Sequence, residues 1–164
     1  MLVLDEAVAG TEAIETNSKH YMPLLACKPL PINTIILEKG TDMIIYENNF
    51  FYIEKEESEI PWLKIFTQER YKELGDLPKD IRQKLWEIYD IIEYEMKEYY
   101  HPKKINMASF ANMLPRVHVH VMARFENDSY FPNPMWGDKV REANLNLPDE
   151  NLFYEKIKKA LKHI

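Results

Sequence analysis

The sequence contains almost no cysteine and no long apolar run, and each lack excludes a class of protein. Cys27 is the single cysteine among 164 residues, so neither an internal disulfide nor a four-cysteine zinc site can form, and a reducing compartment fits best. No apolar stretch approaches the ~20 residues that cross a bilayer. No basic residue precedes Lys19, which argues against a secretory signal. These features predict a cytoplasmic protein with no membrane partner.

Basic residues are outnumbered by acidic ones. The chain has 21 Lys and Arg against 27 Asp and Glu, which gives a formal net charge of -6. Broad electrostatic binding of nucleic acid depends on many Lys and Arg that neutralise phosphates. We therefore expect no nucleic-acid partner, and an anionic substrate would need a locally positive pocket.

The composition allows one compact domain, because a chain of 164 residues that is 46% apolar can bury a real core. Residues 1–42 differ from the rest, since Pro23, Pro29 and Pro31 interrupt them and no periodicity persists. We expect an N-terminal extension over 1–42, with a short helix at 2–14 and a strand at 34–37. The domain proper is expected over 43–164.

Strand signals dominate the start of this domain. Runs rich in β-formers predict strands over 43–46, 50–55 and 63–67, and Asn48 and Asn49 predict the first turn. Two further strands are expected over 104–109 and 116–124. This pattern indicates an antiparallel meander that is extended later in the chain.

Helical signals fall at two places. Apolar residues at steps of three and four predict a helix over 80–99, with Pro78 tolerated in its first turn; the apolar set is Ile81, Leu85, Ile88, Ile92, Met96 and Tyr99. A segment rich in proline over 126–137 cannot be regular. A final helix over 149–164 should bury Phe153, Ile157, Ala160 and Ile164. The order of elements argues for the α+β class.

The predicted strand 116–124 carries the residues that can do chemistry. Alternate side chains of a strand share a face, so Arg116, His118 and His120 should lie together while the intervening valines face the core. A guanidinium offers fixed donors to phosphate oxygens, and a neutral imidazole can attack phosphorus. Two other interpretations stay open: two incidental surface histidines, or two ligands of a zinc ion.

Several other residues are weaker candidates. Asn106 and Asn112 precede this strand and could orient a phosphate or a sugar hydroxyl, or cap backbone groups. Arg124 is either a phosphate contact or solvated. The aromatic candidates either face a base or pack the irregular segment; they are Trp62, Phe131 and Trp136. Surface positions are expected for the acidic run Glu54, Glu56, Glu57 and Glu59 and for the scattered His20, His101 and His163.

From about Met43 to its end the chain resembles a bacterial branch of the histidine triad (HIT) family, whose signature is His-φ-His-φ-His-φ-φ on a strand. Its flanks also resemble the family: Glu-Ile-Pro-Trp at 59–62, Leu-Pro at 114–115, Ala-Arg-Phe-Glu-Asn-Asp at 123–128 and the segment from Phe131 to Gly137. The second and third triad positions fall on His118 and His120. The first falls on Arg116, in a subgroup where glutamine is common there.

The resemblance implies an α+β fold with an antiparallel sheet of about five strands, one long helix and a C-terminal helix, paired as a homodimer. It also implies hydrolysis of a dinucleoside polyphosphate or a nucleoside phosphoramidate, with no cofactor or metal. His118 would be the nucleophile that forms a nucleotidyl-histidine, and His120 would contact the phosphate or the hydrogen-bond network. Asn112 would touch phosphate oxygens and Asn106 would steady the pocket.

Arg116 departs from the family pattern and changes the expected chemistry. A guanidinium cannot donate a proton catalytically at neutral pH, although it could stabilise charge that builds up in a phosphoryl transition state. Two alternatives therefore remain: a nucleotide-binding module without catalysis, and a metal-binding protein that uses His118 and His120. The leading hypothesis requires the His118 ring to be presented to phosphorus in a pocket.

Overall fold

The computed structural model describes residues 43–164. The predictions of an extension over 1–42, a helix at 2–14 and a strand at 34–37 lie outside the described residues, and the domain boundary stays a prediction. Within 43–164 no helix has the length and apolar character needed to cross a membrane.

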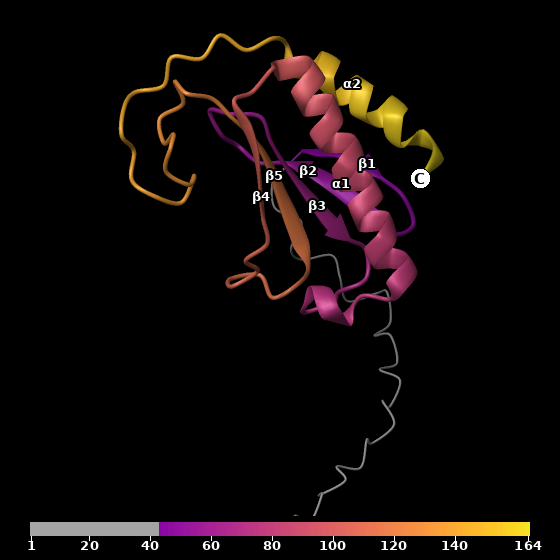
Figure 1. Cartoon of the computed structure of the whole chain (residues 1–164). Helices are drawn as coiled ribbons and strands as arrows, with labels where there is room; N and C mark the ends of the chain where they lie inside the picture. Colours follow the sequence, from indigo (N-terminus) through magenta and orange to yellow (C-terminus); the bar gives the residue numbers. More distant parts are fainter. Residues whose placement is uncertain (1–42) are drawn as a thin grey trace, which may run out of the picture. The chain divides into compact units, whose positions relative to one another are not determined.

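The centre of the described fold is one antiparallel sheet of five strands in the order β1-β2-β3-β5-β4 (Figure 1). The strands are β1 (Ile44–Glu47), β2 (Phe51–Lys55), β3 (Trp62–Thr67), β4 (Lys104–Ala108) and β5 (His118–Arg124). The predicted turn is present, since the Asn48 side chain accepts hydrogen bonds from the backbone N–H groups of Phe50 and Phe51. The expected antiparallel sheet of about five strands is confirmed.

Two helices accompany the sheet, α1 (Lys79–Tyr100) and α2 (Glu150–Ala160). In Figure 1, α1 crosses in front of the sheet and α2 lies beside it. The predicted apolar stripe is the face that α1 buries, with Leu85, Ile88, Ile92 and Met96 completely buried. Helix α1 contacts β5 and α2 contacts β1, so both helices cover the same core. This is the α+β arrangement that the sequence predicted.

Strand alternation fixes which side chains enter this core. Val117, Val119 and Val121 are at most 2% exposed and belong to the main apolar cluster, together with Phe51 and Ile53 of β2. The intervening residues of β3 and β5 therefore point to the opposite face of the sheet, which carries the histidines.

Two element boundaries differ from the predictions by more than one residue. Strand β5 begins at His118 instead of Arg116, because the Arg116 N–H donates to the Leu114 carbonyl and the Val117 N–H donates to the Tyr71 carbonyl. Neither group is then available to the β-ladder. The final helix ends at Ala160 and continues as a 3₁₀ turn over Leu161–His163, which buries Leu161 while Ala160 and Ile164 are half-buried.

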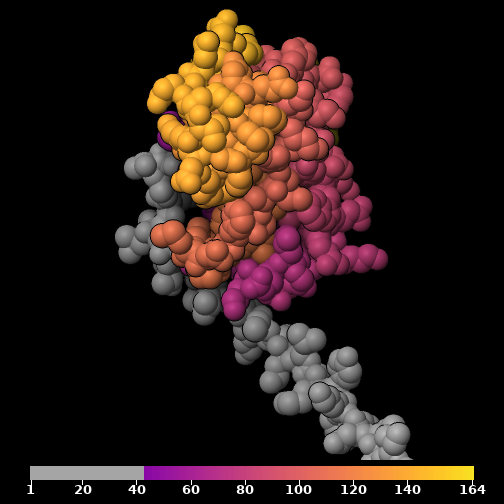
Figure 2. Space-filling view, turned by 60° about the vertical axis from the view of Figure 1, so that its left-hand side comes forward, coloured from indigo at the N-terminus to yellow at the C-terminus, as the bar shows by residue number. Residues whose placement is uncertain are grey.

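The long connection from β5 to α2 has no regular secondary structure up to residue 149, as predicted for 126–137. Figure 2 shows this orange-to-yellow segment as a continuous mass of side chains against the rest of the domain. A short 3₁₀ helix at Leu74–Asp76, which no sequence signal predicted, precedes α1.

Candidate functional site

The histidine face is defined here as the side chains of Trp62, Lys64 and Phe66 on β3 and of His118 and His120 on β5. The two strands are paired so that Phe66 lies opposite His118 and Lys64 lies opposite His120. His118 is 7% exposed and His120 is 9% exposed. Both imidazoles are therefore largely removed from water, and their hydrogen bonds decide their chemistry.

His118 is held in one tautomer. Its Nδ1 lies 3.0 Å from the carbonyl oxygen of Arg116, and because that oxygen can only accept, Nδ1 carries the proton. The ring stacks on Phe66, with centroids 4.9 Å apart and planes 19° apart. Burial lowers the pKa of His118, whereas the bond to the Arg116 carbonyl raises it. The ring is therefore neutral at pH 7, with a free lone pair on Nε2.

His120 has the opposite tautomer. The indole Nε1 of Trp62 donates to Nδ1 of His120 over 3.0 Å, so Nδ1 is unprotonated and Nε2 carries the hydrogen. Burial, and then the nearby His118 and Lys64, lower the pKa of His120 to about 4. The His118 and His120 rings meet edge to face at 4.8 Å. A neutral imidazole whose Nε2 has a lone pair and a neutral imidazole whose Nε2 carries a hydrogen thus lie side by side.

Arg116 lies on the same face and is 8% exposed. Its Nη2 donates to the carbonyl of Thr67, and its guanidinium carbon lies 5.4 Å from the ring centre of Tyr52 and 5.2 Å from that of Phe66. Its Nε is buried without a hydrogen-bond partner among the described residues. Burial lowers the pKa of Arg116, but a guanidinium stays charged at neutral pH. A buried N–H that lacks an acceptor is a position at which an anion would be stabilised.

The two asparagines are not part of this group. Asn106 lies on β4 and its Oδ1 accepts from Nη1 of Arg124 at 3.1 Å. Asn112 is exposed between β4 and β5, and its side chain makes no hydrogen bond to another described residue. The structure therefore brings Arg116, His118 and His120 together, and it links Asn106 to a different cluster.

Both sequence interpretations of Arg124 are wrong. The side chain is neither solvated nor free for a phosphate: the residue is 1% exposed and Nε and Nη2 donate to Asp128 at 2.8 and 3.0 Å. Burial alone would raise the pKa of Asp128, but the Arg124 guanidinium and the N–H groups of Phe125, Phe131 and Tyr130 lower it to about 2. Arg124 also donates to the carbonyl of Asn133. This buried ion pair anchors the irregular segment.

The same segment places Trp136 beside the histidine face. Its ring centre lies 5.3 Å from His120, 5.1 Å from Trp62 and 4.5 Å from Phe110, each in an edge-to-face contact. Packing was one of the two interpretations offered for Trp136, and these contacts agree with it. The side chain nevertheless remains 49% exposed. Phe131 lies under the Arg124 guanidinium at 5.8 Å.

The acidic run is not the uniformly solvated loop that was expected. Glu54 is a residue of β2 that is 6% exposed and lies 3.7 Å from Lys64. Glu59 accepts from both the backbone N–H and the hydroxyl of Ser129. Only Glu57, whose side chain is 81% exposed, fits the prediction clearly. Sequence reasoning missed these partners because Glu59 and Ser129 are 70 positions apart.

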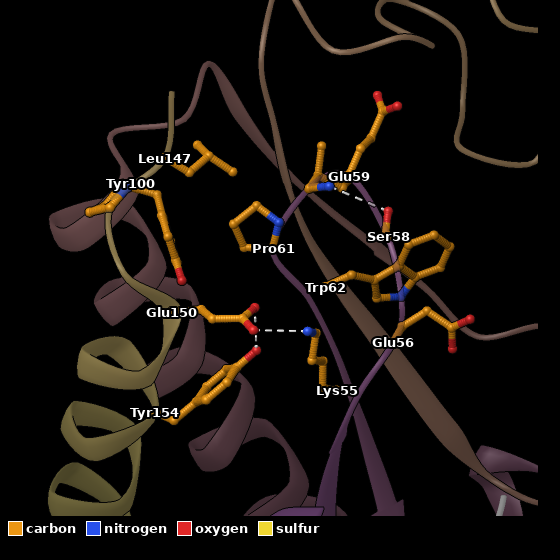
Figure 3. Close-up of a pocket in the computed structure, with 12 residues that line it drawn as sticks. Lys55, Glu56, Ser58, Glu59, Pro61, Trp62, Tyr100, Leu147, Glu150 and Tyr154 are labelled. Atoms are coloured by element: carbon orange, nitrogen blue, oxygen red, sulfur yellow. Dashed lines mark hydrogen bonds and ion pairs between the residues drawn. The ribbon is translucent and has the colours of Figure 1, made fainter. Parts of the chain in front are cut away.

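Two pockets are the best formed in the described part of the chain, with volumes of about 230 and 130 Å³, and neither is lined by His118 or His120. In the larger one, Lys55 and Tyr154 converge on Glu150, and Trp62 lies on the opposite side of the pocket from Tyr100 and Leu147 (Figure 3). Both histidines nevertheless keep a small exposed fraction, 7% for His118 and 9% for His120.

Metal ligation finds little support among residues 43–164, where no three His, Cys, Asp or Glu side chains converge on one point. His101 and His163 are exposed, as predicted, and His20 lies outside the described residues. Of the ligands that a zinc site would need, only the pair His118 and His120 lies together in the described residues.

The fold and the face together define an α+β protein with two neutral histidines on adjacent positions of one side of an antiparallel sheet. The HIT domain matches residues 37–127, and the chain belongs to the histidine triad (HIT) family. No curated protein gives a significant match. The expected family and fold are confirmed.

Solved structures with the same fold come from several bacteria. A histidine triad protein from Sinorhizobium meliloti has 26% identity and a TM-score of 0.60, with 73% of this chain and 90% of that chain covered. A histidine triad protein from Bradyrhizobium japonicum has 21% identity and a TM-score of 0.62 over the same shares. One from Marinobacter aquaeolei has 21% identity and a TM-score of 0.61, covering 74% and 89%.

Proposed function

We propose that this protein hydrolyses a nucleotide derivative, either a dinucleoside polyphosphate or a nucleoside phosphoramidate, through a nucleotidyl group on His118. The observation that carries the proposal is the fixed tautomer of His118, whose Nδ1–H is bound to the Arg116 carbonyl and whose Nε2 accepts no hydrogen bond from another described residue. Family membership supports a nucleotide substrate. The particular leaving group and base belong to the proposal.

The chemistry balances without an outside reagent. Nε2 of His118 attacks the α-phosphorus, a P–N bond forms, and the bond from phosphorus to the leaving group breaks with its electron pair on the leaving group. An anhydride releases a phosphate anion, whereas the nitrogen of a phosphoramidate takes a proton from water and leaves as an amine. The positive charge that develops on the ring is stabilised by the Arg116 carbonyl at Nδ1. Water then attacks phosphorus, the P–N bond breaks, and a nucleoside monophosphate is released with the water's second proton going to solvent.

Arg116 and His120 supply donors in this proposal. His120 presents Nε2–H to a phosphoryl oxygen, because Nδ1 is occupied by Trp62. Arg116 contributes its fixed charge and its Nε–H, which has no hydrogen-bond partner among residues 43–164. Because a guanidinium cannot protonate a leaving group, anhydrides, which leave as stable phosphates, should be cleaved faster than phosphoramidates. Arg116→Gln and Arg116→His test this part of the proposal. An unchanged ratio of anhydride cleavage to phosphoramidate cleavage in these variants would contradict it.

We propose that substrate entry uncovers the histidine face, because His118 and His120 are less than 10% exposed. Trp136 is the described side chain that we propose moves, since it contacts His120, is half-exposed and belongs to a segment without regular secondary structure. Binding of a non-hydrolysable nucleotide should then change the tryptophan fluorescence of a Trp86→Phe variant, and most of that change should be lost when Trp136 is also replaced by Phe, which leaves Trp62 as the remaining indole. An unchanged spectrum at saturating nucleotide, with binding established by calorimetry, would contradict this route.

The decisive test uses a panel of nucleotide anhydrides and phosphoramidates, with and without a chelator. We expect turnover that survives the chelator and falls at least about a thousandfold in His118→Ala, as loss of a nucleophile does. Binding without turnover would select the non-catalytic module, which Arg116 at the first triad position favours. Activity or stability that depends on added metal would select the metal-binding alternative.

Two accompanying predictions remain proposals. A homodimer would pair apolar surface that stays exposed in the single chain, where Tyr94 on α1 is 60% exposed and Met107 on the edge strand β4 is 45% exposed. Light scattering on the full chain should give twice the monomer mass. A cytoplasmic location also stays a proposal, for which the single cysteine is one argument.

A further inference from the structure

We propose that Trp62 is a positioning residue that fixes the tautomer of His120. The Nε2 atoms of the two neighbouring histidines then differ: that of His118 has a lone pair, and that of His120 carries a hydrogen. The role in turnover rests on the proposed function, whereas the tautomer itself can be measured without any substrate.

The indole is well suited to this task because it is a donor only. An indole N–H cannot accept a hydrogen bond, so a 3.0 Å contact to Nδ1 of His120 requires that nitrogen to be unprotonated. Trp62 and His120 are both less than 10% exposed, so water competes little for the bond. A hydroxyl in the same place could donate or accept and would leave the tautomer open.

The position of the indole is itself fixed. Trp62 is the first residue of β3 and is paired with Met122 of β5, and it packs in a small apolar cluster with Met122 and Ile60. The ring centre of Trp136 lies 5.1 Å from that of Trp62, in an edge-to-face contact. The donor is thus held by a strand that is hydrogen-bonded to the strand of its acceptor.

The consequence is a division of roles between two identical side chains. The Arg116 carbonyl fixes the proton of His118 on Nδ1, and Trp62 fixes the proton of His120 on Nε2. Because alternate residues of β5 share one face, both rings serve the same site. If His120 were protonated on Nδ1, its Nε2 would offer a second lone pair and would repel a phosphoryl oxygen.

The wild-type chain tests the tautomer directly by NMR of protein with ¹⁵N-labelled histidine and tryptophan. We expect His120 to show a protonated Nε2, an unprotonated Nδ1 and a scalar coupling between that Nδ1 and the Trp62 Nε1. A His120 protonated on Nδ1 in the free protein would overturn the proposal, and this readout needs no variant to fold.

Two substitutions add the functional readout. Trp62→Phe keeps an aromatic ring and removes the donor; we expect the coupling to vanish, the Nδ1-protonated form of His120 to become detectable, and kcat to fall about three- to tenfold with KM within about twofold. Trp136→Phe removes the other indole N–H that lies beside His120 and should leave the coupling and the tautomer unchanged. A Trp62→Phe enzyme with wild-type kcat and wild-type histidine signals would refute the proposal.

The control for kinetics is Trp86→Phe, because Trp86 lies on α1, 38% exposed and outside the histidine face. Failure of the proposed function would appear separately, as hydrolysis that persists in His118→Ala. The tautomer of His120 would then still be decided by the spectrum of the wild-type chain.

Discussion

Replacing Asp128 by Asn should strongly destabilise the domain, because Asp128 is a fully buried acceptor for five donors. Its two oxygens accept from Nε and Nη2 of Arg124 and from three backbone N–H groups. Asparagine keeps the shape, but its NH₂ group would face two of these donors, and the Arg124 charge would stay buried without a counter-ion. Breaking one partner of such a pair costs about 3–5 kcal/mol.

Urea unfolding followed by circular dichroism measures this loss. With a slope of about 1–3 kcal/mol per molar urea, the midpoint should fall by about 2 M. Glu126→Gln is the matched control, since it makes the same acid-to-amide change in a pair with Lys103 whose side chains are 66% and 59% exposed. Its midpoint should not move measurably. Equal, small shifts in the two variants would refute the assignment of Arg124 and Asp128 as the anchor of the irregular segment.

Further predictions concern pH and the asparagines. The pKa values of His118 and His120 are lowered in the fold, so the unfolded chain binds more protons below pH 6.5, and stability should decline as the pH falls from about 6.5 to about 4. At about 1.4 kcal/mol per pKa unit, His120 accounts for up to about 3 kcal/mol of this decline, and urea midpoints should depend less on pH in His120→Asn. Asn106→Ala should cost about 1–2 kcal/mol because Nη1 of buried Arg124 loses its acceptor, whereas Asn112→Ala should leave the midpoint unchanged. A larger loss in Asn112→Ala than in Asn106→Ala would contradict the contacts described.

Local periodicity predicted the parts of the fold that depend on neighbouring residues. The steps of three and four from Ile81 to Tyr99 identify the buried stripe of α1, and the alternation of valines with histidines identifies the two faces of β5. The start of β5 was misplaced because the partner of the Val117 N–H is Tyr71, far earlier in the chain. Backbone pairing between distant residues leaves no signal in a short window of sequence.

The site was predicted less completely, for the same reason. The strand pattern places Arg116, His118 and His120 together, but it carries no information on Trp62, which lies 58 positions from His120. The sequence shows only that Arg124 is charged, which favours a solvated or substrate-binding side chain. It does not reveal that Asp128 and Asn106 surround this residue. Charged residues that are buried in pairs contradict the usual rule of exposure.

Chemical capture of the intermediate tests the central claim most directly. Rapid quenching of the full chain during turnover of a nucleotide anhydride, followed by peptide mass spectrometry, should find a nucleoside monophosphate group attached to His118 and released by acid. The adduct should be absent from His118→Ala, which should also have lost turnover. Undiminished hydrolysis in that variant, or turnover in the wild type with no adduct at the earliest times, would contradict the account.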